Sequence, residues 1–311
     1  MAMKVVVLVG GVGGAKLAYG LAQVLPPEDL TVIVNTGDDT WLYGLRICPD
    51  LDTITYTLSD LVNKENGWGV AGDTFNTINA MRRYGEDAWF GLGDQDMATH
   101  LLRTRWLREG QSLTEITIRL TKKLGIHQQI LPMTNAPVAT IVDTKEYGEI
   151  DFQTYFVRYR WQPTVKSLRL AGIDQASVSP EVETALNEAD VLLIGPSNPW
   201  LSIDPILNVP GMRELIVKRD IPRVAISPIV GGEAIKGPAA KLMLELGHKA
   251  VSAEAVAHYY GDVINGYVYD VVDGDLTVPQ QNVTKFETIM KTDEIKVALA
   301  RNVLEWIEQW N

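Results

Sequence analysis

Short apolar runs, each followed by a polar turn, are the most regular pattern along the chain. Four such runs span Val5–Val9, Leu30–Val34, Val191–Ile194 and Arg223–Ile226. Runs of this length without polar alternation are typical of strands buried on both faces, as in parallel sheets covered by helices. We therefore expect these segments to be strands of one mainly parallel sheet.

The turns that follow these four runs are rich in glycine, asparagine, aspartate, serine and proline. In chain order they read GGVGGAK, NTGDDT, GPSNP and SPIVGG. In open α/β sheets, ligands bind beyond the carboxyl ends of the strands, where such turns lie together. The four turns are therefore expected to converge on one crevice.

The region between the second and third runs has a different pattern. Residues 56–125 carry apolar positions three and four apart, which predicts helices. Residues 137–160 alternate polar and apolar positions, with many β-branched and aromatic residues, which predicts antiparallel strands. This region therefore predicts a mixed helical and antiparallel insertion.

We expect residues 1–311 to form a single α/β domain with a Rossmann-like, doubly wound, mainly parallel sheet. Its core is predicted over residues 1–55 and about 165–311, with the insertion at about 56–164. Residues 291–310 predict an amphipathic helix, whose tryptophans Trp306 and Trp310 we assign to docking rather than to chemistry.

The glycine-rich turn after the first run has the strand, loop and helix order of a phosphate-binding site. It fits neither familiar template, since Leu17 stands where the P-loop has Ser or Thr, and Lys16 stands where the dinucleotide fingerprint has its third glycine. Gly11, Gly13 and Gly14, together with Lys16, therefore predict an anion site without identifying the anion.

Composition and charge narrow the possible partners. Of the 311 residues, 46% are hydrophobic and 22% are charged, and the net charge is -11. Broad nucleic-acid binding needs a basic surface, so we expect no nucleic-acid partner. No apolar run suits a membrane span or a secretory signal. Cys48, the single cysteine, cannot form an internal disulfide, so we expect a cytoplasmic protein with Cys48 as a small buried residue.

Four carboxylates follow the second apolar run, at Asp38, Asp39, Asp50 and Asp52. Each has a structural alternative as the cap of a turn or helix. Near a phosphate site, however, four negative charges need neutralisation, and Mg²⁺ prefers oxygen ligands and bridges carboxylates to phosphates. We therefore favour a metal or substrate role for at least one of them.

The sequence GDQDMATH adds Asp94, Asp96 and His100 to the candidates. Their structural alternative is a helix that begins near Met97, capped by Asp94 or Asp96 and carrying His100 on one face. A lone histidine is a weak signal for catalysis, so we do not assign His100 a catalytic role.

The third and fourth turns offer groups that suit a nucleotide. Ser197 and Asn198 lie in a proline-bounded turn and present a hydroxyl and a carboxamide. The segment SPIVGGEAIKGPAAKLM adds Ser227, Lys236 and Lys241, together with glycines whose amides are free of side chains. Lysines and free amides are the groups that bind a nucleotide diphosphate.

Together, the motifs GGVGGAKL, NTGDD, PDLDT, GDQDMATH, LPMTNAPVAT, IGPSNPWLSIDPIL and ISPIVGGEAIKGPAAKLM resemble the 2-phospho-L-lactate transferase family of deazaflavin coenzyme biosynthesis. The resemblance covers residue 4 to about residue 260. It implies a Rossmann-like core with an insertion, a Mg²⁺ requirement and a homodimer.

The resemblance also implies a reaction. A guanosine-diphosphate-activated three-carbon acid (lactyl-2-diphosphoguanosine, or its enolpyruvyl or glyceryl equivalent) is the donor, and the ribityl hydroxyl of the deazaflavin Fo is the acceptor. The phosphoacid is transferred, GMP is released, and the product is the first phosphodiester form of coenzyme F(420). Positioning and charge neutralisation carry most of the catalysis in such phosphoryl chemistry.

Residue roles follow from the same resemblance. Asp52, in PDLDT, is implied to contact the deazaflavin and to orient or deprotonate its ribityl hydroxyl. Asp38 and Asp39 are the candidate metal ligands. The expected substrate-binding residues are Gly11, Gly13, Gly14 and Lys16 at the phosphates, Ser197, Asn198, Ser227 and Lys241 along the guanosine, and also Asn35 and Asp94.

One residue departs from the family pattern. Relatives often carry a basic or polar residue just before LGD that reaches the deazaflavin, and this chain has Gly91 there. We therefore expect either a shifted acceptor or a substitute residue.

Two other functions remain open. A nucleotide-binding regulator would keep the phosphate-binding turns without needing the DLDT carboxylates or a deazaflavin pocket. A nucleotide-sugar-type binder of the same fold, serving envelope metabolism, is the second. Within the transferase hypothesis the acid itself is open, because the three candidates differ only by a methyl, methylene or hydroxymethyl group.

Overall fold

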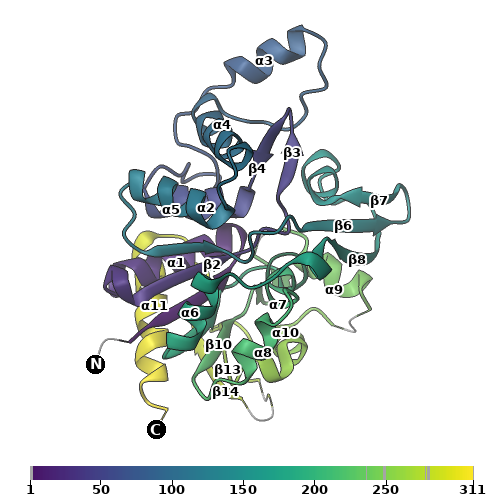
Figure 1. The fold of residues 1–311 in the computed structure, drawn as a ribbon. Helices are drawn as coiled ribbons and strands as arrows, with labels where there is room; N and C mark the ends of the chain where they lie inside the picture. Colours follow the sequence, from purple (N-terminus) through teal and green to yellow (C-terminus); the bar gives the residue numbers. More distant parts are fainter. Residues whose placement is uncertain (1–2, 236, 248–249, 277, 279–280, 311) are drawn as a thin grey trace.

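A seven-stranded parallel sheet with helices on both faces forms the centre of the molecule (Figure 1). The computed structural model describes residues 3–235, 237–247, 250–276, 278 and 281–310. The strand order is β14-β13-β10-β9-β1-β2-β5, and every neighbouring pair is parallel. The strands are β1 (Val5–Val9), β2 (Leu30–Val34), β5 (Gln129–Pro132), β9 (Val191–Ile194), β10 (Arg223–Ile226), β13 (Gly266–Asp270) and β14 (Asn282–Phe286). The predicted fold class and the four predicted strands are confirmed.

Both faces of this sheet are buried, which explains why its strands are continuously apolar. In β1, Val5, Val7 and Val9 pack in one core with α1 (Gly11–Val24), α2 (Pro49–Leu58) and α11 (Asp293–Ile307). Val6 and Leu8 face the other core, which contains residues of α6 (Pro180–Glu188), α8 (Met212–Val217) and α10 (Ala253–Tyr260). The result is a three-layer, doubly wound sandwich.

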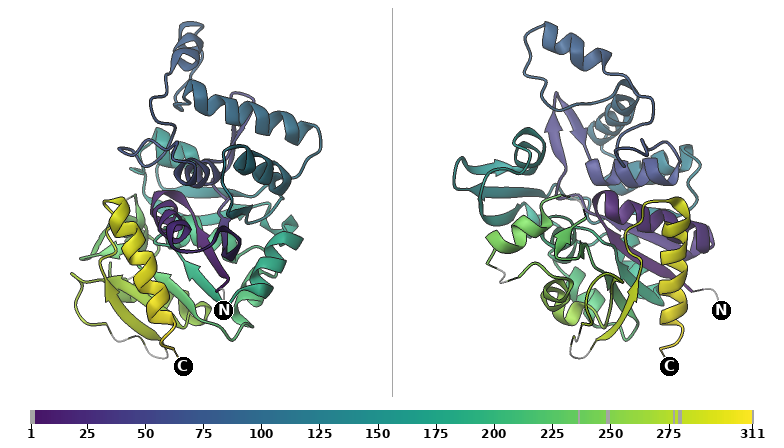
Figure 2. Two further views of the ribbon diagram at one scale, coloured as in Figure 1. Left: turned by 90° about the vertical axis from the view of Figure 1, so that its left-hand side faces the viewer. Right: turned by 180° about the vertical axis from the view of Figure 1, so that it is seen from behind.

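A second group of elements lies beyond the carboxyl ends of the strands, and α3 is farthest from the sheet (Figure 2). It contains the hairpin of β3 (Thr40–Leu42) and β4 (Leu45–Ile47), followed by α3 (Asn76–Arg83), α4 (Asp94–Arg108) and α5 (Leu113–Lys123). A small core that includes Ile47, Ile78 and Leu92 holds the hairpin and α3 together. These elements cover the edge of the sheet where the four turns lie.

The predicted insertion does not match a division in the structure. β5 falls within residues 56–164 but pairs with β2 as an edge strand of the main sheet. β6 (Ala139–Thr144), β7 (Gly148–Asp151) and β8 (Val165–Ala171) form the expected antiparallel sheet, but β8 lies beyond the predicted boundary. One strand of the predicted insertion, β5, therefore belongs to the main sheet, and one strand of the predicted core, β8, belongs to the small antiparallel sheet.

The segment after β7 also differs from the prediction of a strand. Thr154–Arg158 form a short π-helix, because the carboxylate of Asp151 accepts hydrogen bonds from the backbone N–H and the hydroxyl of Thr154. Such a bond favours the start of a helix over continuation of a strand. The remaining elements are η1 (Pro27–Asp29), η3 (Ile173–Gln175), η4 (Pro199–Ile203), α7 (Asp204–Leu207), β11 (Ile229–Val230), β12 (Glu233–Ala234), α9 (Ala239–Glu245) and η5 (Gly261–Val263).

The C-terminal helix α11 packs closely on α1. A Cβ at Gly20 of α1 would lie 2.2 Å from the backbone oxygen of Lys296, so glycine permits this contact. Trp306 and Trp310 meet edge to face, with 4.8 Å between ring centroids, and Trp310 covers Gly266 of β13. The prediction that the two tryptophans serve docking is confirmed.

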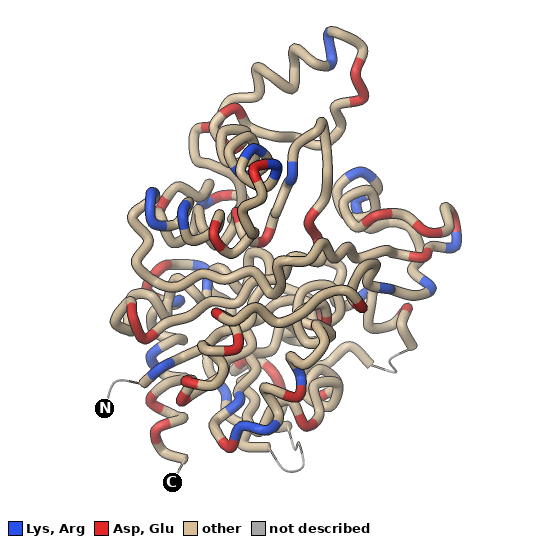
Figure 3. The backbone as a smooth tube through the Cα atoms, viewed as in Figure 1, with Lys and Arg blue, Asp and Glu red and all other residues tan. Residues whose placement is uncertain are grey.

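Two whole-molecule properties bear on the possible partners. Acidic and basic positions are interspersed along the chain (Figure 3). Among the described helices, none combines the length and the apolar character that crossing a membrane requires.

Replacing Gly20 with alanine should destabilise the protein. The added Cβ forces α11 away from α1 at a cost of about 1–3 kcal/mol, which exceeds or cancels the gain in helix propensity of about 1 kcal/mol. The free energy of unfolding, measured by urea titration, should therefore fall, by up to about 2 kcal/mol. Gly274→Ala, where no heavy atom approaches within 4 Å, is the control. A clear stabilisation by Gly20→Ala would contradict the packing described here.

Candidate functional site

One cavity of about 760 Å³ lies at the carboxyl edge of the sheet. Residues from all four polar turns line it: Gly10 to Gly13 from the first, Asp38 from the second, Pro196 to Asn198 from the third and Pro228 from the fourth. The prediction that these turns converge on one crevice is therefore confirmed for the described residues.

The glycine loop meets the GPSNP turn where the strand order reverses, between β1 and β9. The Ser197 hydroxyl accepts the N–H of Gly10 at 3.0 Å and donates to the C=O of Gly10 at 2.7 Å. A Cβ at Gly13 would lie 2.2 Å from the carbonyl oxygen of Pro196, so only glycine allows this approach. This is the topological switch point at which doubly wound folds bind their ligands.

A buried carboxylate sits at the N-terminus of α1. Asp50 accepts the N–H of Gly11 at 2.7 Å on one oxygen and the side-chain N–H of Asn35 at 2.9 Å on the other. Burial raises the pKa of Asp50 to about 6, despite these two hydrogen bonds. The amide of Gly11, the first residue of α1, is thus held by an internal anion.

Asp38 and Asp39 lie in different environments although they are adjacent. Asp38 is buried and lines the cavity, and its Oδ1 has no hydrogen-bond partner among the described residues. Burial, together with the negative charges of Asp50 and Asp39, raises the pKa of Asp38 well above its ordinary value. Asp39 turns instead to Arg46, at 3.2 Å, and burial raises its pKa to about 6. A cation beside Asp38 would remove an unfavourable interaction between buried like charges.

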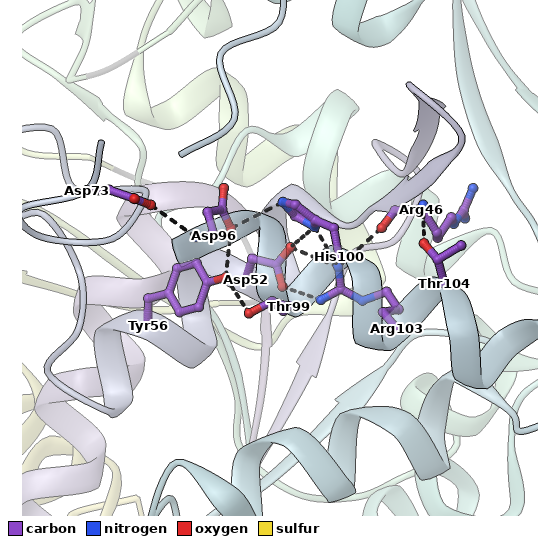
Figure 4. Close-up of polar contacts among 9 residues, drawn as sticks. All are labelled: Arg46, Asp52, Tyr56, Asp73, Asp96, Thr99, His100, Arg103 and Thr104. Atoms are coloured by element: carbon purple, nitrogen blue, oxygen red, sulfur yellow. Dashed lines mark hydrogen bonds and ion pairs between the residues drawn. The ribbon is translucent and has the colours of Figure 1, made fainter. Parts of the chain in front are cut away.

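A second polar group lies on α2 and α4 (Figure 4). Arg103, which is fully buried, donates through both terminal nitrogens to the two oxygens of Asp52, one of them at 3.1 Å. Burial opposes the charge on Arg103, but the charge and hydrogen bonds of Asp52, together with Cys48 and Tyr56, raise the pKa of the guanidinium above its ordinary value. This geometry fixes Asp52 in one orientation at the cavity wall.

His100 extends this network to Asp96. Its Nδ1 lies 3.2 Å from Nη1 of Arg103, and because a guanidinium only donates, Nδ1 accepts and the proton resides on Nε2. Nε2 lies 3.2 Å from Oδ1 of Asp96, close but outside hydrogen-bond geometry, and this oxygen accepts a hydrogen bond from the hydroxyl of Tyr56 at 2.7 Å. Burial alone would raise the pKa of Asp96, but its interactions with His100 and Tyr56 lower this pKa below its ordinary value.

Asp52, Asp96 and His100 offer ligand atoms within 4.8 Å of one another, a spacing that suits a metal ion. Both oxygens of Asp52 are already bound by Arg103, so a cation here would meet a guanidinium at close range. Asp38 has an unpartnered oxygen, and the groups that bind the oxygens of Asp50 are neutral amides rather than a cation. The chemistry of the donor sets therefore favours Asp38 and Asp50 over this cluster as a magnesium site.

The rest of the cavity wall is largely aromatic and apolar. It includes Trp68, Phe75, Phe90, Phe152, Phe156 and Trp161. Gly91 also lines this part, and the nearest atom to a Cβ placed there would be in the ring of Phe75, at 3.8 Å. The cavity thus joins a polar end at the glycine loop to an apolar end with space beside Gly91.

The sequence matches the model of the family described as 2-phospho-L-lactate transferase CofD over residues 5–305. The chain belongs to this family. A 2-phospho-L-lactate transferase from Methanosarcina mazei is 43% identical over 268 residues, which cover 86% of this chain and 87% of the relative. A phosphoenolpyruvate transferase from Streptomyces coelicolor is also 43% identical, over 277 residues, 88% of this chain and 87% of the relative.

Membership of the 2-phospho-L-lactate transferase family confirms the resemblance drawn from the motifs and makes the chain a transferase of this type. A UPF0052 family protein from Bacillus halodurans shares the fold, with a TM-score of 0.63 at 15% identity, covering 98% of this chain and 99% of that protein.

The cavity brings together about half of the predicted site residues. Those that line it are Gly11, Gly13, Lys16, Asp38, Asp52, Ser197 and Asn198. Asn198 is suited to ligand binding because its Oδ1 accepts the N–H groups of Trp200 and Leu201, while its buried Nδ2 has no partner among the described residues. An unpaired buried donor of this kind is costly unless a ligand or water accepts its hydrogen bond.

The structure places the other predicted residues outside the cavity lining. They are Gly14, Asn35, Asp39, Asp94, Ser227 and Lys241. A Cβ at Gly14 would lie 2.6 Å from the Cβ of Val9, so that glycine permits packing of α1 on β1. Asn35 is fully buried and holds Asp50 and the C=O of Leu201.

The remaining side chains satisfy nearby polar groups. Asp94 accepts the N–H groups of Asn76 and Thr77 at the start of α3, at 2.9 and 3.0 Å. Ser227 donates to the C=O of Ile229 at 2.8 Å. Lys241 donates to the C=O of Pro163 and to Glu245, each at 2.7 Å. Lys236 lies outside the described residues. Cys48, as expected, is buried, and burial raises the pKa of its thiol.

Several lining residues carried no sequence signal. Thr288, Ile289 and Met290, just before α11, reach the cavity from a segment without a motif. Arg103 is separated from Asp52 by 51 positions, so nothing in the sequence pairs them. The spacing of Asp96 and His100, one helical turn apart, was the one available hint of a shared face.

Removing the partner of Asp52 should destabilise the protein strongly. Arg103→Met leaves an ionised carboxylate buried without its partner, and the free energy of unfolding should fall by about 3–5 kcal/mol in urea titrations at neutral pH. Arg105→Met, at an exposed position of the same helix, should change it by less than about 1 kcal/mol.

The double variant Arg103→Met with Asp52→Asn tests the pairing itself. It should recover part of the loss, because the uncompensated charge is removed as well. Losses that simply add in the double variant would contradict a direct interaction between the two residues.

Proposed function

We propose that this protein transfers a phospho-three-carbon-acid group (2-phospholactate, phosphoenolpyruvate or phosphoglycerate) from its guanosine-diphosphate-activated form to the ribityl hydroxyl of Fo, releasing GMP, in coenzyme F(420) biosynthesis. The observation that carries this proposal is the single cavity that joins the glycine loop to the fixed carboxylate of Asp52. The names of the two relatives, a 2-phospho-L-lactate transferase and a phosphoenolpyruvate transferase, support a phosphoacid transferase.

The donor would occupy the polar end of the cavity. Backbone N–H groups at the start of α1 and the side chain of Lys16 suit its two phosphates. The unpaired Nδ2 of Asn198 supplies a donor for the nucleotide. The carboxylate of Asp50 already accepts the N–H of Gly11, so an entering phosphate would compete with it for this amide. The phosphate would either displace the carboxylate or be bridged to it by a cation.

The acceptor would lie against the aromatic end, with its hydroxyl toward Asp52. The hydroxyl oxygen attacks the phosphorus that bears the three-carbon acid, the bond from that phosphorus to the bridging oxygen breaks, and GMP leaves with that oxygen. The proton of the hydroxyl passes to the phosphate of the departing GMP. Asp52, held by Arg103 through both oxygens, accepts a hydrogen bond from the attacking hydroxyl and aligns it. Little covalent work falls to the protein in such a transfer.

Magnesium fits this site at Asp38. The unpartnered Oδ1 of Asp38 and the neighbouring carboxylate of Asp50 are the oxygen donors that Mg²⁺ prefers. A bound ion would offset the negative charge of the phosphates. Asp39, which is paired with Arg46 and does not line the cavity, is the less suitable of the two predicted ligands.

Turnover is the direct test of the proposal. Purified protein with Fo, Mg²⁺ and each guanylylated acid in turn should give an Fo phosphodiester with at least one donor, detected by chromatography and mass. Asp52→Asn should lower kcat by about 10²-fold or more, because the acceptor loses its fixed hydrogen-bond partner. Asp60→Asn, at an exposed position after α2, is the matched control and should retain activity.

Different outcomes separate the candidate functions. Nucleotide binding without product, and with no binding of Fo, would favour the regulator of the same fold. A donor preference among the three acids would identify the transferred group. The relatives do not identify it, because a 2-phospho-L-lactate transferase and a phosphoenolpyruvate transferase are both 43% identical to this chain.

The proposed metal site makes its own prediction. Asp38→Asn should raise the Mg²⁺ concentration for half-maximal activity by about tenfold or more, because the ion loses a charged oxygen ligand. Asp39→Asn should raise it less. Equal effects of the two substitutions on the Mg²⁺ titration would show that Asp39 also acts on the ion.

A further inference from the structure

The described part of the cavity lining has more acidic than basic side chains. Its carboxylates are Asp38, Asp50, Asp52 and Asp96, whereas Lys16 and Arg160 are its lysine and arginine. The proposed donor carries two phosphates and a carboxylate. Each cation in the wall is therefore important for holding it, and the role of Arg160 is unassigned.

Arg160 is an exposed guanidinium without a hydrogen-bond, ion-pair or ring partner among the described residues. Arg158, two positions earlier, provides a contrast. It forms an ion pair with Asp87 at 3.0 Å and lies over the ring of Trp89, 5.7 Å from its centroid. Of these two arginines, only Arg160 lines the cavity.

The backbone around Arg160 adopts a conformation that side chains disfavour. Arg160 and Trp161 have φ values of 51° and 49°, in the left-handed region that glycine adopts most easily. Residues held in this region cost free energy and occur often at ligand-binding sites. The turn directly follows the π-helix Thr154–Arg158, another feature that is frequent at functional sites.

Hydrogen bonds and ring contacts hold this turn in place. The N–H of Trp161 donates to the C=O of Tyr155 at 3.0 Å, and Tyr155 is fully buried. The rings of Phe156 and Trp161 lie 5.2 Å apart. Just before the π-helix, Gln153 donates to the backbone oxygen of Asp38 at 2.9 Å, which ties this segment to the acidic turn after β2.

From this arrangement we infer that Arg160 binds the carboxylate of the three-carbon acid in the donor. The inference rests on the proposed function. With the phosphates at the glycine loop and Lys16, the carboxylate is the remaining anionic group, and a guanidinium matches it with two parallel hydrogen bonds.

The test compares a donor with and without its carboxylate. The probes are the guanylylated phosphoacid that the wild-type protein uses and guanylylated ethyl phosphate, which has the same diphosphate and no carboxylate. Arg160→Gln should weaken binding of the first by about tenfold or more and leave binding of the second within about twofold. Calorimetric titration without Fo measures both affinities, so the comparison does not require turnover.

Matched variants separate this role from a general loss of structure. Arg158→Gln should bind both donors as the wild type does, and Arg160→Lys should restore part of the affinity for the carboxylated donor. The affinity for GDP should be the same in all variants, because GDP has no carboxylate. Arg160→Gly should lose donor affinity yet raise the urea midpoint of unfolding, because glycine relieves the strained φ.

The inference would be overturned by either of two results. One is wild-type protein that binds both donors equally well. The other is Arg160→Gln that weakens both donors by the same factor. If the wild type prefers the carboxylated donor and loses this preference in Arg160→Gln, but no Fo product forms, then the proposed transfer fails while the carboxylate contact stands.

Discussion

Burial of negative charge is the constraint on which this site depends. Several carboxylates are buried around the cavity, and a buried ion is tolerated only where a specific partner compensates it. Asp50 has the amide of the glycine loop and the side chain of Asn35, and Asp52 has Arg103. Asp38 alone among these three lacks a partner for one oxygen within the described chain. A cation would therefore stabilise the structure most beside Asp38. A phosphate donor would bring a cation to this same place.

Helix α2 connects the two ends of the cavity through its first turn. Asp50 and Asp52 are two positions apart, so they point in directions about 200° apart around the helix. Asp50 consequently reaches the glycine loop, and Asp52 reaches α4. A single turn of helix therefore fixes the distance between the donor end and the acceptor end, which positional catalysis requires.

The sequence predicted those elements whose residue types follow directly from their own burial or from a close backbone contact. Strands buried on both faces must be continuously apolar, so β1, β2, β9 and β10 were predicted with their observed bounds. The glycine loop was equally clear, because close approach of two backbones excludes side chains. β5 was missed because four residues ending in proline give little signal, and the π-helix was missed because one side chain, Asp151, overrides the alternating pattern.

Polar residues in turns were harder to assign. Ser227, Lys241 and Asp94 have the types that bind ligands, but the structure uses them for nearby carbonyls, carboxylates and helix ends. The same side chains satisfy backbone groups and bind substrates, and only the three-dimensional surroundings distinguish the two uses. Arg103 shows the reverse case, because its importance comes from a partner on another helix.

The contact between α1 and α11 has a consequence for the order of assembly. The glycine loop is encoded within the first residues of the chain, yet the helix that it begins is covered by α11, and Gly20 lies against Lys296. On the ribosome, the N-terminal strand and helix emerge long before the segment that packs on them. Contacts of such large sequence separation form late. The anion site that begins α1 therefore receives its final support from a segment that is synthesised long after it.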